Sequence, residues 1–124
     1  MLKQIELWDR KFNLDVTFKD LDDEGVLDKQ HESIDKFILS KEQMRVSLEA
    51  IKSYIIKDEN SDVEVNDIKN IFKYVIPESI YIRREMVERE VIIMCDYKFN
   101  IEHGIAIVFE NEKFKAITDQ DSVL

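Results

Sequence analysis

The stretch from Val91 to Ile117 constrains the fold of this chain more than any other part. It contains three apolar segments, VIIMCDY, IAIVFE and KFKAI, separated by the polar turn KFNIEHG and by the dipeptide NE. The first two segments carry apolar residues on both faces, which is typical of strands at the centre of a sheet. Because short turns between consecutive strands give antiparallel pairs, we expect this region to form the buried middle of an antiparallel sheet.

A second strand pattern lies near the amino terminus. Apolar and polar residues alternate from Phe12 to Phe18, and a shorter alternation runs from Gln4 to Trp8. A period of two indicates strands with one buried face. Asp9, Arg10 and Lys11 separate the two runs, so we expect a hairpin with a three-residue turn. Trp8 lies at the tip, where an indole ring more often covers the edge of a core than binds a ligand.

Between these regions the apolar spacing becomes helical. We expect helices from Asp28 to Leu39, from a Ser40-x-x-Gln43 capping box to about Lys57, and from Asn66 to Tyr74 before Pro77, followed by a strand from Ser79 to Arg84. The element order is then two strands, three helices and four strands. This order indicates an α+β fold with an antiparallel sheet of about six strands and three helices on one face. The length of 124 residues favours a single domain over residues 1–124.

Charge and composition limit the classes of function. The chain has 18 basic and 27 acidic residues, which gives a net charge of −9. Such a surface repels phosphate backbones, so we expect no binding to nucleic acid. Cys95 is the only cysteine and lies in an apolar run, which predicts a buried thiol and no internal disulfide. The sequence shows no signal peptide and no apolar run that could span a membrane, so we expect a cytoplasmic protein without membrane partners.

Two acidic loops are the candidate partner-binding surfaces. The carboxylates that we expect to face a basic protein are Asp20, Asp22, Asp23, Glu24, Asp58, Glu59, Asp62 and Glu64. Such runs are usually just solvated, and an excess of acidic residues is also a common route to solubility. Their spacing does not match a calcium-binding loop, so we expect no metal at either loop.

The turn Glu102-His103-Gly104 is the only place where a titratable residue sits in a structurally demanding position. In a functional interpretation, His103 and Glu102 act with Asp96 or Asp121 in acid–base or metal chemistry. In a structural interpretation, Gly104 supplies an unusual backbone conformation and its neighbours satisfy nearby backbone groups. A closed zinc site would lack its preferred ligands here. We therefore favour the structural interpretation and expect no catalytic residue and no cofactor.

Several short motifs resemble a family of bacterial domains of unknown function. The family carries an EHG turn, a strand that ends in an Asn-Gly-type hairpin and a final QD. The matching residues are Asp96-Tyr97, Glu102 to Asn111 and Asp119-Gln120-Asp121, with Leu7-Trp8-Asp9 and Pro77 to Ile82 similar in kind. The resemblance implies a small cytoplasmic accessory protein, and some related acidic domains accompany bacterial toxins as immunity factors.

One departure from the family pattern concerns the second turn. Glu112 stands where the family has glycine after Asn111. A two-residue type I′ turn needs positive φ at both positions, and a residue other than glycine costs about 1 kcal/mol there. The connection is therefore either a longer bulged turn or a strained one. If it is a type I′ turn, we expect Glu112→Gly to raise the melting temperature.

Three functional hypotheses follow. The first is a non-enzymatic interaction protein that neutralises a basic partner, such as a nuclease toxin, through its acidic loops, because matched charges speed association. The second is a structural or accessory domain that forms a homo-oligomer, such as a homodimer, through an exposed sheet face carrying Tyr81 and Tyr97. The third is an enzyme, a small hydrolase or metal-dependent catalyst centred on His103. We favour the first.

Overall fold

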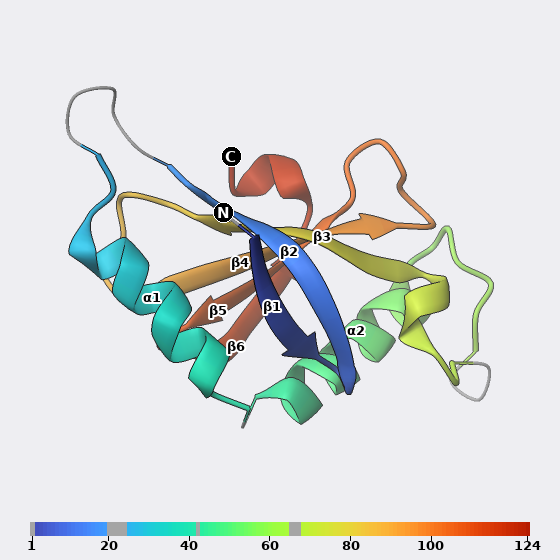
Figure 1. Cartoon of the computed structure of the whole chain (residues 1–124). Helices are drawn as coiled ribbons and strands as arrows, with labels where there is room; N and C mark the ends of the chain where they lie inside the picture. The colour runs from blue at the N-terminus through green and yellow to red at the C-terminus, as the bar shows by residue number, and fades with distance from the viewer. Residues whose placement is uncertain (1, 20–24, 42, 65–67) are drawn as a thin grey trace.

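The computed structural model describes residues 2–19, 25–41, 43–64 and 68–124 (Figure 1). Its elements are β1 (Leu2–Leu7), β2 (Arg10–Phe18), α1 (Asp28–Leu39), α2 (Met44–Lys57), the 3₁₀ turn η2 (Ile71–Lys73), β3 (Val75–Ile82), β4 (Glu90–Tyr97), β5 (Ile105–Glu110), β6 (Lys113–Thr118) and the 3₁₀ turn η3 (Gln120–Ser122). Six strands form one sheet in the order β1-β2-β3-β4-β5-β6. The α+β class and the strand number are therefore as predicted.

The sheet is mixed, and the prediction of an antiparallel sheet was wrong for one pair. β2 and β3 run parallel, with Asp15 opposite Ser79 and Phe18 opposite Ile82. All other neighbouring strands are antiparallel. The parallel pair follows from the connection, because the two helices between β2 and β3 carry the chain back to the end of the sheet where β2 began.

The first two predicted helices are present. α1 has the predicted bounds, whereas α2 begins at Met44 and not at a Ser40 cap. Ser40 is extended and ends α1, with its backbone N–H donating to the Phe37 carbonyl. The side-chain oxygen of Gln43 accepts a hydrogen bond from the Phe114 backbone N–H at 3.1 Å. Because Gln43 is occupied with β6 in this way, the capping box does not form, and the contact instead joins the start of α2 to the edge of the sheet.

The predicted third helix was wrong. Its first residues, Asn66 and Asp67, lie outside the described part of the chain, and from Ile71 to Lys73 there is only a 3₁₀ turn. Ile71 and Val75 are buried as the spacing indicated, but Val75 already belongs to β3. β3 also contains Pro77, which lies at a register shift where the strand bulges and a missing N–H is tolerated. The helical spacing of apolar residues in this segment therefore came from a 3₁₀ turn followed directly by a strand, and not from an α-helix.

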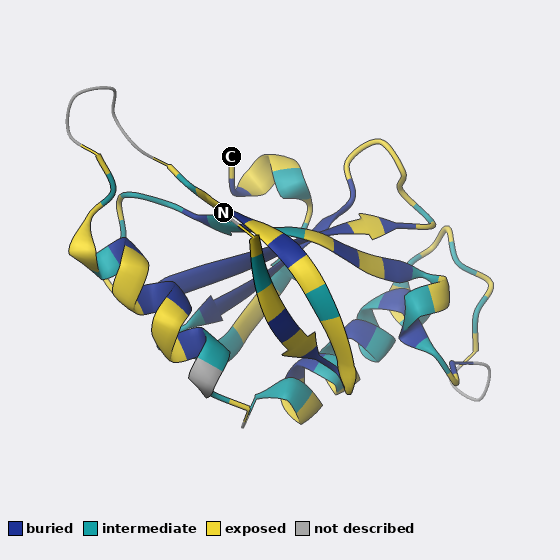
Figure 2. Ribbon diagram, viewed as in Figure 1, coloured by how far each residue is buried: buried dark blue, intermediate teal, exposed yellow. Residues whose placement is uncertain are grey.

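β4 and β5 form the buried centre of the sheet, as predicted (Figure 2). On one face Ile93, Ile107 and Phe109 pack with residues of α1 and α2 in the main core. On the opposite face a smaller cluster contains Ile92, Met94, Ala106, Val108 and Val123. Both helices therefore cover the same face, and the segment after β6 covers part of the other.

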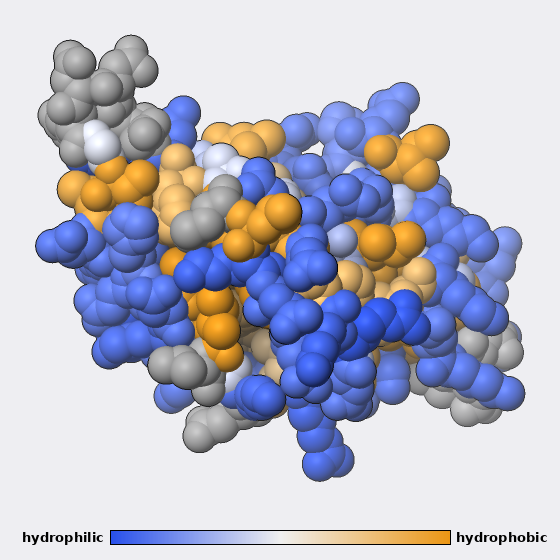
Figure 3. Space-filling model, in the orientation of Figure 1, coloured by the Kyte–Doolittle hydropathy of each residue, from blue (hydrophilic) through white to orange (hydrophobic). Residues whose placement is uncertain are grey.

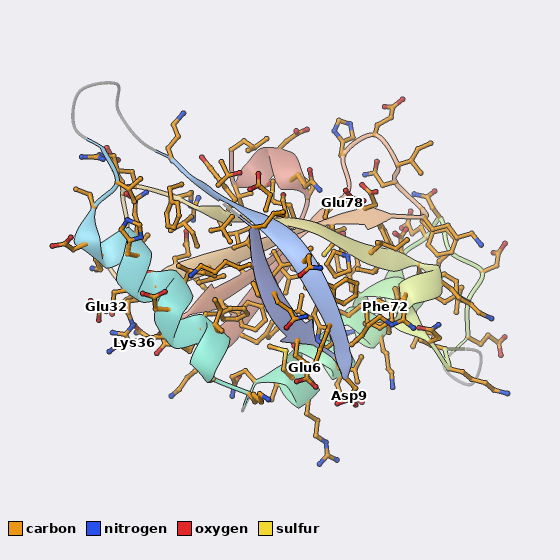
Figure 4. All side chains as sticks on the ribbon, viewed as in Figure 1. Glu6, Asp9, Glu32, Lys36, Phe72 and Glu78 are labelled. Carbon is orange, nitrogen blue, oxygen red and sulfur yellow. The ribbon has the colours of Figure 1, made fainter. Side chains whose placement is uncertain are left out.

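The hairpin of β1 and β2 has a two-residue turn and not the predicted three-residue turn. Trp8 and Asp9 both have positive φ, 52° and 66°, which fits a type I′ turn that matches the twist of the strands. The Trp8 indole is 7% exposed and its N–H donates to the Ser47 hydroxyl at 2.9 Å. Its ring packs 6.2 Å from Phe72, which lies beside the tip of the hairpin in Figure 4. Trp8 therefore covers the core edge.

Candidate functional site

Among the predicted partner-binding carboxylates that the structure describes, Asp58 at the end of α2 is the one held by hydrogen bonds. Asp58 follows the last helical residue, Lys57, and is half-buried. One carboxylate oxygen accepts a hydrogen bond from the Tyr97 hydroxyl at 2.7 Å, and the other accepts one from the Asn60 backbone N–H at 2.8 Å. Asp58 thereby ties the loop after α2 to the end of β4.

Tyr97 reaches Asp58 because of the alternation in β4. Residues 93, 95 and 97 share the face that packs against the helices, so the Tyr97 ring points into the core and is 2% exposed. Burial raises the pKa of the Tyr97 hydroxyl, and the hydrogen bond to Asp58 raises it further. The hydroxyl therefore stays protonated and donates to the carboxylate.

A hollow of about 410 Å³ lies beside this hydrogen bond, where the loop after α2 meets the turn between β4 and β5. It is lined by Tyr54, Lys57, Asp58, Asn60, Tyr97, Phe99 and Asn100. Burial raises the pKa of the Tyr54 hydroxyl, with smaller contributions from the charges of Asp58 and Asp119. Both segments lie at the same end of the sheet in Figure 1. This end combines aromatic rings, amide groups and carboxylates.

The other predicted partner-binding residues fall into two groups. Glu59, Asp62 and Glu64 are exposed on the loop that follows Asp58. The first acidic loop, Asp20, Asp22, Asp23 and Glu24, lies outside the described residues. The structure therefore places one of the two predicted acidic loops, and that loop borders the hollow.

The EHG turn combines features of both interpretations. Gly104 has a φ of +58°, and a Cβ atom there would lie 2.5 Å from the Cys95 carbonyl oxygen, so the predicted need for glycine is confirmed. The exposed His103 places Nδ1 2.8 Å from the Asp121 carboxylate. Glu102 is exposed on the same turn. The pair therefore links this turn to η3, and within the described residues no serine hydroxyl or cysteine thiol is hydrogen-bonded to His103.

Asp96 does not join His103. The protonated Glu78 carboxyl donates a hydrogen bond to Asp96, which raises the pKa of Glu78, with burial and the charge of Asp96 as smaller causes. Glu78 projects from β3 on the side opposite the helices in Figure 4. Across the described ranges, no group of three or more His, Cys, Asp or Glu residues is placed to hold a metal ion. The predicted constellation is thus divided between two pairs, His103 with Asp121 and Glu78 with Asp96.

The two tyrosines of the homodimer hypothesis lie on opposite faces of the sheet. Tyr97 is buried against the helices, so its predicted place on an exposed face was wrong. Tyr81 is half-buried against the smaller cluster on the other face. On the side of the molecule seen in Figure 3, hydrophobic side chains form separate patches among hydrophilic ones. Cys95 is buried, as predicted, and burial raises the pKa of its thiol.

Sequence reasoning missed the aromatic wall of the hollow. The alternation in β4 does place Tyr97 on the same face as Ile93, so its burial could have been read from the sequence. Its partner Asp58 is 39 residues away, and no local pattern indicates that contact. Phe99 and Tyr54 also come from separate elements, and only the folded sheet brings them together.

A comparison with protein families decides the classification. The family model described as "Domain of unknown function (DUF6985)" matches residues 2–124. The chain belongs to this family. Neither the curated proteins nor the solved structures include a match to this DUF6985 domain. Among its described residues, no helix has both the length and the apolar character required to cross a membrane.

Proposed function

We propose that this DUF6985 protein is a non-enzymatic cytoplasmic binding domain that captures a basic protein at the loop after α2. In its sharpest form the proposal is an immunity protein that neutralises a basic toxin, and the resemblance described above suggests this form. The observation that carries it is the row of exposed carboxylates, Glu59, Asp62 and Glu64, beside an aromatic hollow. Interfaces commonly combine such rings with a charged rim.

Charge supports the same role. The net charge of −9 attracts a basic protein over several ångströms and repels nucleic acid. Complementary charge raises the association rate more than the final affinity. Fast capture suits a protein that must block a toxin before the toxin meets its target. The identity of the adjacent gene is an independent check, because a large secreted toxin encoded directly upstream would support the immunity form.

The test is capture of partners from cytoplasm of the source cell at low and at high salt. The loop variant carries Glu59→Gln, Asp62→Asn and Glu64→Gln. Its matched control carries Glu32→Gln, Asp35→Asn and Glu49→Gln, three exposed acids on the helices. Both variants lose the same formal charge, so a difference between them reports position and not net charge.

We expect the loop variant to lose the captured protein and the helix variant to retain it. The wild-type complex should weaken as salt rises, because exposed charges are screened. Equal effects of the two variants would contradict a binding surface at this loop. Binding that strengthens with salt would contradict the electrostatic role itself.

A further inference from the structure

The hollow beside Asp58 has an unusual combination of groups for an exposed depression. Its carboxylate is held in place by two hydrogen-bond donors, the Tyr97 hydroxyl at 2.7 Å and the Asn60 backbone N–H at 2.8 Å. Both donors are neutral. No lysine or arginine in the described part of the chain forms an ion pair with this carboxylate. Asp58 therefore presents an oriented negative charge with lone pairs left for a further donor.

Aromatic rings flank this charge. The Tyr97 ring meets Tyr54 edge-on, with ring centroids 5.7 Å apart, and meets Phe99 edge-on at the same separation. Tyr97 is buried, whereas Tyr54 and Phe99 are half-buried and line the hollow. The face of an aromatic ring attracts a cation, most strongly where water is partly excluded. The aromatic rings and the Asp58 carboxylate thus both favour binding of a positively charged group.

The chain already places one of its own cations near one ring of the hollow, Phe99, and near its neighbour Tyr74. The Lys98 ammonium lies 5.6 Å from the centroid of the Tyr74 ring and 5.8 Å from that of Phe99. Tyr74 and Phe99 stack with their centroids 5.8 Å apart. Aromatic side chains at this end of the sheet therefore attract positive charge within the molecule itself.

The polar lining favours a guanidinium over an ammonium group. Asn60 and Asn100 line the hollow with Asp58 and are exposed, and the Asn100 side-chain oxygen, which accepts the His103 backbone N–H at 3.3 Å, keeps a second lone pair. A planar guanidinium has five N–H donors and stacks on ring faces, whereas an ammonium is a compact and strongly hydrated charge. Lys57 also lines the hollow and opposes any cation, but it is exposed at the end of a long stem.

We infer that this hollow binds an arginine side chain. The guanidinium stacks between Tyr54 and Phe99 and donates to Asp58 and to the two asparagine oxygens. The site itself does not depend on the proposed function. Only the origin of the arginine does, because under that function the arginine belongs to the basic partner and anchors the partner here. The volume of about 410 Å³ leaves room for the guanidinium and its alkyl stem.

The probe is N-ethylguanidinium, which reproduces the end of an arginine side chain. It is titrated into the folded protein at constant ionic strength and followed by NMR. We expect saturable shifts of the Tyr54 and Phe99 ring signals and of the Asn60 and Asn100 side-chain amides. Ethylammonium should bind more weakly. Shifts that do not saturate, or tighter binding of ethylammonium, would overturn the inference.

Paired variants test the roles of individual residues. Asp58→Asn should weaken binding about tenfold or more, because a hydrogen bond to a charged group is lost. Asp62→Asn removes the same charge from the same loop outside the hollow, and we expect less than about a twofold effect from screened charge at that position. Equal losses in the two variants would overturn the assignment to Asp58.

A variant that binds N-ethylguanidinium more tightly provides a further test, because misfolding would lower the affinity and not raise it. Lys57→Met removes the opposing charge while keeping an unbranched stem, so the affinity for N-ethylguanidinium should rise. A fall in affinity in this variant would overturn the placement of the cation beside Lys57. Binding of N-ethylguanidinium without capture of any basic protein would leave the arginine site intact and refute the proposed function. Partner capture that is insensitive to Asp58→Asn would refute the placing of the partner's arginine in this hollow and leave the proposed function intact.

Discussion

Gly104 is the glycine with less freedom to change. Its φ of +58° already disfavours a side chain, and an added Cβ would lie 2.5 Å from the Cys95 carbonyl oxygen, which belongs to the central strand β4. Gly25 has a similar φ of +67° but has no atom within 4 Å of the corresponding position. Alanine substitutions at the two glycines therefore distinguish the cost of backbone strain from the cost of steric overlap.

We expect Gly104→Ala to lower the free energy of unfolding by about 3 kcal/mol, from strain and overlap together. Gly25→Ala should cost only about 1 kcal/mol, from strain alone. Urea unfolding followed by circular dichroism measures both. Equal losses would mean that the contact with Cys95 relaxes without cost.

Glu78 gives a prediction about pH. Its pKa is raised above the ordinary value of 4.5, first by the hydrogen bond with Asp96. Because the folded state holds this proton more tightly than the unfolded state, the pair contributes stability at low pH. That contribution is lost as the pH rises from about 4.5 through the folded pKa. Glu78→Gln keeps a donor towards Asp96 at all pH values.

We therefore expect Glu78→Gln to be more stable than the wild type at pH 7, with the difference shrinking as the pH falls through the folded pKa towards about 4.5. Urea unfolding of both proteins across this range measures the effect. An unchanged difference at every pH would show that Glu78 does not titrate with Asp96.

At the scale of elements, the β5–β6 hairpin carries strain that one ion pair offsets. Asn111 and Glu112 both have positive φ, 50° and 65°, so the connection is a two-residue type I′ turn, followed by a register shift opposite Val108 and Phe109. The Glu112 carboxylate forms two hydrogen bonds with the Arg89 guanidinium, at 2.9 and 3.1 Å. The side chain thus has a role that the sequence did not indicate.

This ion pair changes what Glu112→Gly should do. The substitution relieves strain worth about 1 kcal/mol but also removes the acceptor of two Arg89 hydrogen bonds, while Glu32 remains 3.9 Å from Arg89. We expect little change in melting temperature in the wild type and an increase in an Arg89→Ala background. Thermal unfolding of the four proteins forms a double-mutant cycle. A decrease in the Arg89→Ala background would show that the turn tolerates Glu112 without strain.

The joint between the first hairpin and α2 depends on one buried hydrogen bond. Ser47 is fully buried, accepts from the Trp8 indole at 2.9 Å and donates to the Met44 carbonyl at 3.0 Å. Ser47→Ala leaves the indole N–H unsatisfied, and we expect a loss of about 1–3 kcal/mol. Trp8 is the only tryptophan, so its fluorescence reports unfolding directly. Ser53→Ala on the same helix is the control, and a similar loss there would contradict the specific role of Ser47.

At the scale of the whole molecule, the features that could be predicted from the sequence are those that depend on the local pattern of apolar and polar residues. The burial of β4 and β5 could be predicted because apolar residues on both faces leave a strand no exposed side. The parallel pairing of β2 with β3 could not, because Asp15 and Ser79 are separated in the sequence by both helices and no local pattern joins them. The hollow beside Asp58 was hidden for the same reason, since its walls come from α2, β4 and the turns that follow them.

The parallel pair also sets an order of events during synthesis. The β1–β2 hairpin leaves the ribosome first, yet its one neighbour in the sheet, β3, is made only after α1 and α2. A hairpin alone is marginally stable in water. Until β3 emerges, the β2 edge of this hairpin has no strand partner, and because an unpaired edge invites aggregation we expect the nascent amino-terminal third to gain most from a chaperone.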